Sequence, residues 1–175
     1  MAGHDGPTDA ALTVLSSATS GARLVSGGTP APVGPLLAEQ FPQVEVATRM
    51  FPRSISVRDP KNDRMFELEE ALFVDSTVNR VFQFDFLRGN PETALSDPFS
   101  IVLSEETARQ VFGKTDALGE SLLLGGQKMP FVVTGVVRNF PETAHIHFDF
   151  LAPFANIVDV EPAFARENIL KAQTK

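Results

Sequence analysis

Apolar and polar residues alternate with a period of two along much of the chain, which is typical of strands that bury one face. Phe82, Phe84 and Phe86, for example, are separated by polar residues and predict a half-buried strand or the edge of a turn. Turn-forming sequences lie at residues 59–63 (DPKND) and 125–126 (GG). The strands that the pattern predicts cover residues 44–50, 54–57, 65–74, 99–103, 121–124, 130–137 and 145–151.

Helices are expected to be few and short. Residues 36–41 (LLAEQF) predict a helix that ends before Pro42, and residues 161–173 predict a closing helix. A third helix is expected to follow Ser104, a good N-cap, and to end at Gly113. The expected class is therefore α+β, with mixed and antiparallel sheets and a few short helices.

The amino-terminal segment differs in composition from the rest of the chain. Residues 1–28 hold five of the 12 glycines and none of the 15 phenylalanines, which predicts a flexible leader before a packed unit at residues 29–175. The uncharged stretch at residues 10–22 is shorter than the roughly 20 apolar residues that span a bilayer. No basic region precedes it, so a cleavable secretory signal is not expected.

Composition and charge exclude several classes of function. The chain has no cysteine, which removes thiol nucleophiles, zinc–thiolate sites and disulfide frameworks. Its net charge of −7 argues against nucleic acid as a partner, because that affinity depends on clustered Lys and Arg.

Two motifs of enzymes are incomplete in this sequence. Residues 113–115 (GKT) resemble the end of a phosphate-binding loop, but Ala108 stands where that loop has its first glycine. No G-x-S-x-G elbow is present, and the few histidines leave little choice of base for a nucleophile. We therefore expect no catalytic residue, no cofactor and no enzymatic activity.

His145, His147 and Asp149 are the only candidates for metal ligands. In a strand they would project from one face, where two imidazoles and a carboxylate can bind zinc or iron if a water completes the set. Alternation along a strand with one solvated face explains the same spacing. A small metal-dependent enzyme that uses these three residues is therefore kept as an alternative hypothesis.

Residues 132–151 (VVTGVVRNFPETAHIHFDFL) resemble a signature of the MacB-like periplasmic core domain, which is the extracytoplasmic domain of ABC-transporter permeases in the FtsX-like superfamily. Three upstream blocks, at residues 41–49 with Thr48 and Arg49, 81–95 and 101–119, are similar to the family in the same order. The positions of the signature that match are Thr134, Gly135, Val136, Phe140, Pro141, Glu142, His145, Phe148, Asp149, Phe150 and Leu151.

The resemblance implies a non-catalytic domain at the periplasmic face of the cell membrane. It implies a porter-like α/β lobe and a mixed-sheet lobe, whose boundary we expect near residues 95–97. As partners it implies the membrane helices of the parent permease, a separate cytoplasmic ATPase, periplasmic proteins, and a second copy in a homodimer. In such a permease the domain relays conformational change and contacts substrate or partner proteins, as in efflux. The matched residues are expected to serve the fold.

The chain departs from the family pattern in two ways. The flanking membrane helices are not in this sequence, and the further strands that usually follow the F-D-F-L block are expected to be missing, since the sequence stops at Lys175. We therefore expect a partial core domain. A stand-alone module that binds another protein along an exposed sheet edge is the other alternative hypothesis.

Overall fold

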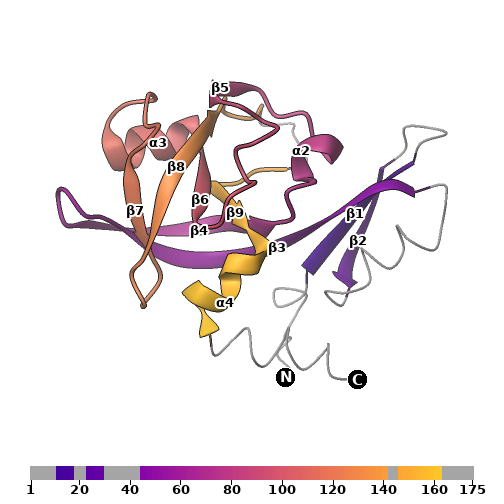
Figure 1. Cartoon of the computed structure of the whole chain (residues 1–175), viewed down its shortest axis with the longest axis horizontal. Helices are drawn as coiled ribbons and strands as arrows, with labels where there is room; N and C mark the ends of the chain where they lie inside the picture. The colour runs from indigo at the N-terminus through magenta and orange to yellow at the C-terminus, as the bar shows by residue number, and fades with distance from the viewer. Residues whose placement is uncertain (1–10, 18–22, 30–43, 142–145, 163–175) are drawn as a thin grey trace.

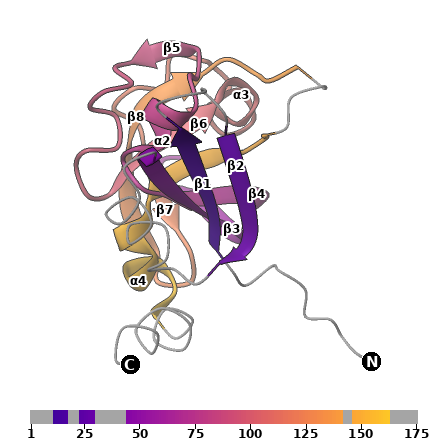
Figure 2. The same ribbon diagram turned by 90° about the vertical axis from the view of Figure 1, so that its right-hand side faces the viewer.

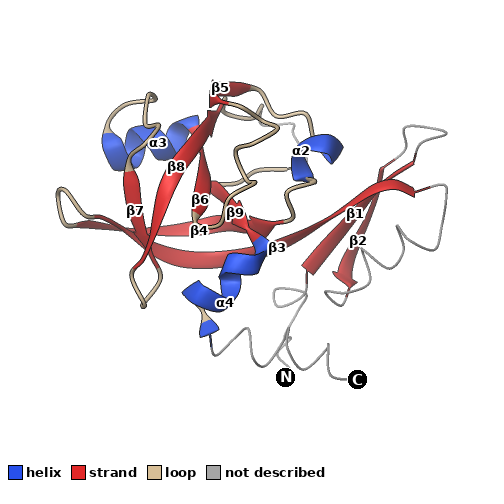
Figure 3. Cartoon of the chain, viewed as in Figure 1, coloured by secondary structure: helices blue, strands red, loops and turns tan. Residues whose placement is uncertain are grey.

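The computed structural model describes residues 11–17, 23–29, 44–141 and 146–162. It contains mixed strands and short helices, which confirms the α+β class (Figure 3). The strands are β1 (Ala11–Ser17), β2 (Arg23–Thr29), β3 (Val44–Asp59), β4 (Arg64–Val74), β5 (Phe86–Gly89), β6 (Ser100–Ser104), β7 (Ser121–Leu124), β8 (Met129–Val137) and β9 (Phe150–Pro153). The helices are α2 (Val78–Val81), α3 (Glu105–Phe112), the 3₁₀ turn η2 (Phe154–Asn156) and α4 (Ile157–Val160).

Six of the strands close into a ring. Strand β3 pairs with β4, and the pairing continues through β9, β6 and β8. Strand β7 then pairs with both β8 and β3, so that each strand of the ring has two neighbours (Figure 1). The pairs β4–β9 and β6–β8 are parallel and the other four are antiparallel. Closure leaves no free edge within the ring.

Strand β3 extends beyond the ring. Its first half pairs with β1, which pairs in turn with β2, so that these three strands form an arm on one side of the molecule (Figures 1 and 2). Its second half pairs with β4 and β7 within the ring. One continuous strand therefore joins the arm to the ring.

Alternation along the central strands builds two hydrophobic cores. In β4, Ala71 and Phe73 belong to one core and Leu72 and Val74 to the other, because successive side chains point to opposite faces. The core inside the ring also takes residues from α3 and α4, and the outer core is covered by α2. Burial on both faces explains why this stretch is a continuous apolar run.

The local signals at α3 and at the β3–β4 turn are confirmed. The Ser104 hydroxyl accepts a hydrogen bond from the Thr107 amide at 3.2 Å, and Gly113 ends α3 at a φ of 74°. In the turn, the buried carboxylate of Asp59 accepts from the Lys61 amide at 3.0 Å and from the Asn62 side chain at 2.8 Å. These bonds satisfy backbone and side-chain groups that would otherwise lack partners.

Three expectations differ from the structure. Residues 44–50 and 54–57 form one strand, because a bulge between Arg53 and Ile55 lets pairing with β4 continue across the gap. Strand β9 begins only at Phe150; residues 146–149 lie before it outside any strand. Phe82 and Phe84 lie in the loop before β5, packed against the outer core, and only Phe86 is in a strand.

Within the predicted leader, the structure describes two segments, β1 and β2, which form a hairpin that pairs with β3. Glycine- and hydroxyl-rich sequences favour loops, yet a backbone ladder with β3 accommodates them. The helix predicted at residues 36–41 lies outside the described residues, as does most of the one at 161–173. The last described helix, α4, precedes that range. None of the described helices is long and apolar enough to cross a membrane.

Candidate functional site

A groove lies where β4 ends, between α2 and the segment that follows β9. It consists of two adjoining hollows, of about 410 and about 660 Å³, that share Ser76 and Ser96. We call it the Ser76–Ser96 groove. Each hollow falls within the roughly 300–1,000 Å³ that is typical of binding sites in proteins.

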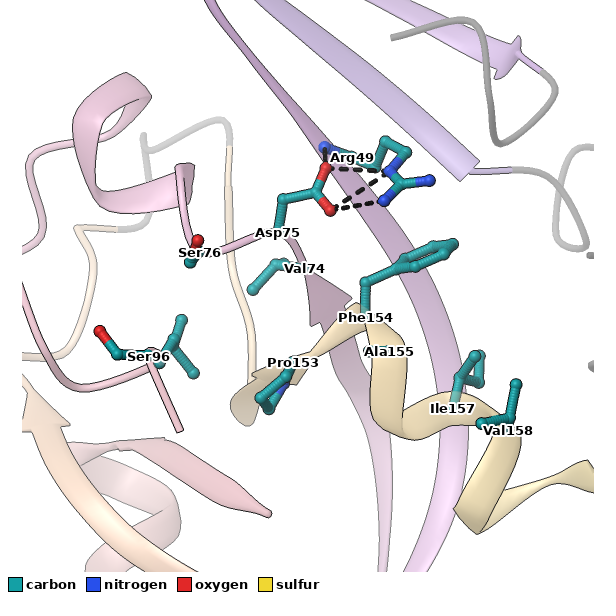
Figure 4. Close-up of a pocket in the computed structure, with 11 residues that line it drawn as sticks. Arg49, Val74, Asp75, Ser76, Ser96, Pro153, Phe154, Ala155, Ile157 and Val158 are labelled. Carbon is teal, nitrogen blue, oxygen red and sulfur yellow. Dashed lines mark hydrogen bonds and ion pairs between the residues drawn. The ribbon is translucent and has the colours of Figure 1, made fainter. Parts of the chain in front are cut away.

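An ion pair between Arg49 of β3 and Asp75 lines the first hollow (Figure 4). The carboxylate accepts from Nε at 2.9 Å, from Nη2 at 2.8 Å and from the Arg49 amide at 2.8 Å. The Asp75 amide donates to the Arg49 carbonyl at 3.2 Å. The two side chains are only 20% and 21% exposed, so the ion pair is largely shielded from solvent. It links β3 to the residue that follows β4.

Apolar side chains form the other wall of the first hollow. The Arg49 guanidinium lies over the Phe154 ring, 4.2 Å from its centre, and that ring contacts Phe51 edge-on. Val158 of α4 is 37% exposed, which is high for a large apolar residue. The apolar residues of this wall are Val74, Leu95, Pro153, Phe154, Ala155, Ile157 and Val158.

The second hollow lies between α2 and residues 91–96, and six of the seven residues that line it are polar. Asn79 holds these two segments together, because its side-chain amide donates to the Pro91 carbonyl at 2.6 Å. Arg80 and Glu92 are exposed on its wall and carry opposite charges. The charged groups of the whole groove therefore balance to zero, two cations against two carboxylates.

Two of the three metal candidates lie in the described part of the chain, and neither has the surroundings of a ligand. His147 is exposed and its ring contacts Phe140 edge-on. Asp149 accepts from the Glu70 amide at 3.0 Å and from the Thr107 hydroxyl at 3.5 Å. His145 lies outside the described residues. Among the described residues no group of three His, Asp or Glu side chains could hold a metal ion.

The T-G-V block lies on β8, where backbones approach closely. The Thr134 hydroxyl donates to the Ala94 carbonyl at 2.6 Å, which ties β8 to the segment that lines the groove. A Cβ on Gly135 would lie 2.7 Å from the Phe86 ring, so only glycine fits without a shift. Val136 is fully buried.

The aromatic residues of the signature pack against other rings. Phe148 is buried between Phe84 and Phe140, with ring centres 5.3 and 4.9 Å away, and Phe150 contacts Phe73 inside the ring of strands. Pro141 is exposed, and Glu142 lies outside the described residues. Apart from Pro141, the signature residues that the structure describes make contacts within the fold, and none of the described ones lines the Ser76–Ser96 groove.

Sequence reasoning singled out Arg49 and Glu92, as parts of upstream blocks, but missed the other polar residues of the groove. Asp75 and Ser76 directly follow the buried run at the end of β4, and polar residues at that place could have been marked as candidates. Ser96 and Phe154 carry no such signal, since only the tertiary fold brings them near Asp75.

Comparisons with known proteins agree with this architecture. The sequence pattern of the MacB-like periplasmic core domain matches residues 5–172. A domain of a protein described as a permease, from Porphyromonas gingivalis, has a similar structure, with 23% identity, a TM-score of 0.62, and coverage of 85% of this chain and 66% of that one. The periplasmic region of MacB from Actinobacillus actinomycetemcomitans shows 13% identity, a TM-score of 0.60, and coverage of 90% and 72%. No curated protein sequence matches the chain.

The fold and the pattern match define an extracytoplasmic module of a membrane transporter. The chain belongs to the MacB-like periplasmic core domain family, the periplasmic domains of ABC-transporter permeases. It spans 66% of the length of the Porphyromonas gingivalis domain.

Proposed function

We propose that this domain relays conformational change between the membrane part of a MacB-like permease and partner or substrate proteins in the periplasm, without catalysing a reaction. In this proposal the parent permease supplies the membrane helices and forms a homodimer. A separate cytoplasmic ATPase supplies the energy. The family match over residues 5–172 supports the role of a permease ectodomain.

The observation that carries the relay is the continuity of β3. A relay has to transmit displacement without deforming, and a single strand of 16 residues runs from the arm into the closed ring. Two guanidinium groups hold it to its surroundings. Arg49 binds Asp75, and Arg53 donates to Glu161, after α4, with Nε 2.9 Å from Oε2. These contacts favour motion of the ring and β3 as one body.

Spin-label distances in the parent permease test this function. The 175 residues contain no cysteine, so Met65→Cys and Leu118→Cys introduce the only cysteines of this domain, at residues that are 60% and 42% exposed. We expect the distance between these two sites within one domain to stay constant through the ATP cycle. The distance between the two copies of residue 65 should change.

A permease with an inactivated ATPase is the control, and in it both distances should stay constant. Constant distances between copies in the active permease would contradict the relay. An equally large change within one domain would contradict its motion as a rigid body.

A further inference from the structure

We propose that the Ser76–Ser96 groove binds an extended, uncharged segment of a partner polypeptide. This inference rests on the proposed function, because it names the surface by which the domain would contact a periplasmic partner. The charge and the lining of the groove support it, and the residues of the groove lie outside the family signature at positions 132–151.

The two hollows adjoin, because Ser76 and Ser96 line both of them. These serines come from the segment after β4 and from the segment before β6, and Figure 4 shows both on the same side of the first hollow. An occupant that fills both hollows has to pass between the two serines. A strand-like peptide, which rises about 3.3 Å per residue, meets this requirement.

The charge of the lining selects against polyanions and polycations. Arg49 is bound to Asp75 in the first hollow, and Arg80 is balanced by Glu92 on the wall of the second. A nucleic acid or an anionic membrane surface requires a cluster of unbalanced cations. The balanced lining therefore favours an occupant without net charge.

The lining offers an extended peptide polar groups for its backbone and an apolar surface for its side chains. Ser76 and Ser96 are exposed polar residues of the lining, and their hydroxyls can bond with the backbone of a peptide that passes between them. The apolar wall beside them, with Phe154 and the exposed Val158, provides a surface for alternate apolar side chains. An uncharged peptide with alternating polar and apolar residues matches both walls.

Amide chemical shifts of the whole chain test the proposal with a defined probe. The probe is a synthetic pool of ten-residue peptides composed only of Ser, Thr, Asn, Gly, Leu, Val and Phe. We expect saturable shifts at the amides of Ser76, Arg80, Ser96 and Val158. Ser76→Phe fills the passage between the hollows, so it should weaken the affinity at least about tenfold, which corresponds to about 1.4 kcal/mol.

Ser54→Phe is the matched control, because Ser54 is an exposed serine of β3 that lies outside both hollows. It should bind the pool like the unaltered chain. Absence of saturable shifts would overturn the proposal. An equal loss of affinity for the peptide pool in Ser76→Phe and Ser54→Phe would overturn it as well. Stronger shifts with a pool rich in Asp and Glu, or with vesicles of anionic phospholipid, would also overturn it.

The spin-label experiment separates this proposal from the proposed function. If the groove binds no peptide while the distance between copies still changes through the ATP cycle, the docking surface is wrong and the relay stands. If Ser76→Phe abolishes binding and leaves that change in place, docking and motion are separate properties of the domain.

Discussion

Gly135 of β8 lies against the ring of Phe86, and a Cβ at this glycine would approach Cε1 of that ring to 2.7 Å. The same glycine pairs with Gly89 across the β5–β8 ladder. At Gly89 a Cβ would come within 2.3 Å of the Thr134 carbonyl oxygen, and φ is +88°. The two glycines thus allow β5 and β8 to approach more closely than side chains would permit.

Alanine at either glycine is expected to destabilise the domain, by different amounts. Gly135→Ala meets a ring that can shift, and should cost about 1–3 kcal/mol. Gly89→Ala meets backbone and also strains a left-handed conformation, and should cost about 2–4 kcal/mol. Urea unfolding of the two variants measures both values.

Gly126→Ala is the control for these variants. A Cβ at Gly126 has no atom within 4 Å, and its φ lies outside the left-handed range. This variant should be neutral or more stable by up to about 1 kcal/mol. Equal losses at all three glycines would contradict the close approach of β5 and β8.

The Arg49–Asp75 pair is expected to couple the arm to the ring energetically. Truncation of both residues in a double-mutant cycle should give a coupling energy of about 1–2 kcal/mol, because the pair is largely shielded from solvent and makes several hydrogen bonds. Arg49→Lys should recover little of it, since an ammonium cannot form the paired contacts. Unfolding in urea measures the four variants of the cycle.

The pair of Glu105 and Arg109 on α3 is the comparison. Arg109 is 57% exposed, so this pair should give only about 0.3–0.5 kcal/mol in the same cycle. If the coupling energy of Arg49 and Asp75 were no larger than that of Glu105 and Arg109, the Arg49–Asp75 pair would not link β3 to the end of β4 as strongly as its hydrogen bonds indicate.

The sequence was sufficient to predict those elements whose causes are local. Ser104 and Gly113 determine the ends of α3, and Asp59 shapes the turn after β3, through contacts within a few residues. The closure of the ring was not predictable, because β7 pairs with β3 across more than 60 positions of the chain. Pairing over such distances depends on how the cores pack, which a pattern of alternation does not record.

Alternation before β9 was a misleading guide to structure. Ile146, Phe148 and Phe150 are more buried than His147, as a strand would place them, yet residues 146–149 belong to no strand, and of these four only Asp149 has backbone hydrogen bonds to β4 and β6. Phe148 is fixed by the rings of Phe84 and Phe140 instead. The groove was missed for a related reason: its walls come from segments spread over residues 49–158, and no short motif spans them.

Acid should weaken a surface cluster centred on Glu120. Hydrogen bonds from Lys61, at 2.7 Å, and from Lys114, at 3.2 Å, lower the pKa of Glu120 from its ordinary value of 4.5. A carboxyl whose pKa is lowered by folding stabilises the fold above its unfolded pKa. This contribution is lost as the pH falls from 4.5 through the lower folded pKa.

Glu120→Gln removes this titration. The variant should lose less stability than the unaltered chain between about pH 6 and about pH 3, and urea midpoints at the two values measure the difference. The difference should shrink in about 1 M salt, where exposed charges are screened. If the variant and the unaltered chain lost the same stability between the two pH values at low salt, the role of Glu120 would be contradicted.

Phe148 and His147 are neighbours, but their truncation is expected to change the stability by very different amounts. Phe148 is 3% exposed and packs against two rings, so Phe148→Ala should cost about 3–5 kcal/mol in urea unfolding. His147 is exposed and loses one edge contact with Phe140, so His147→Ala should change the stability by less than about 1 kcal/mol. Because the described residues form no metal cluster, zinc should leave the melting temperature of the chain and of the His147→Ala variant equally unchanged. A zinc-dependent rise in the melting temperature that His147→Ala abolishes would support the hypothesis of a metal site at His147. A larger loss at His147 than at Phe148 would show that the histidine, and not the aromatic cluster, holds the segment before β9.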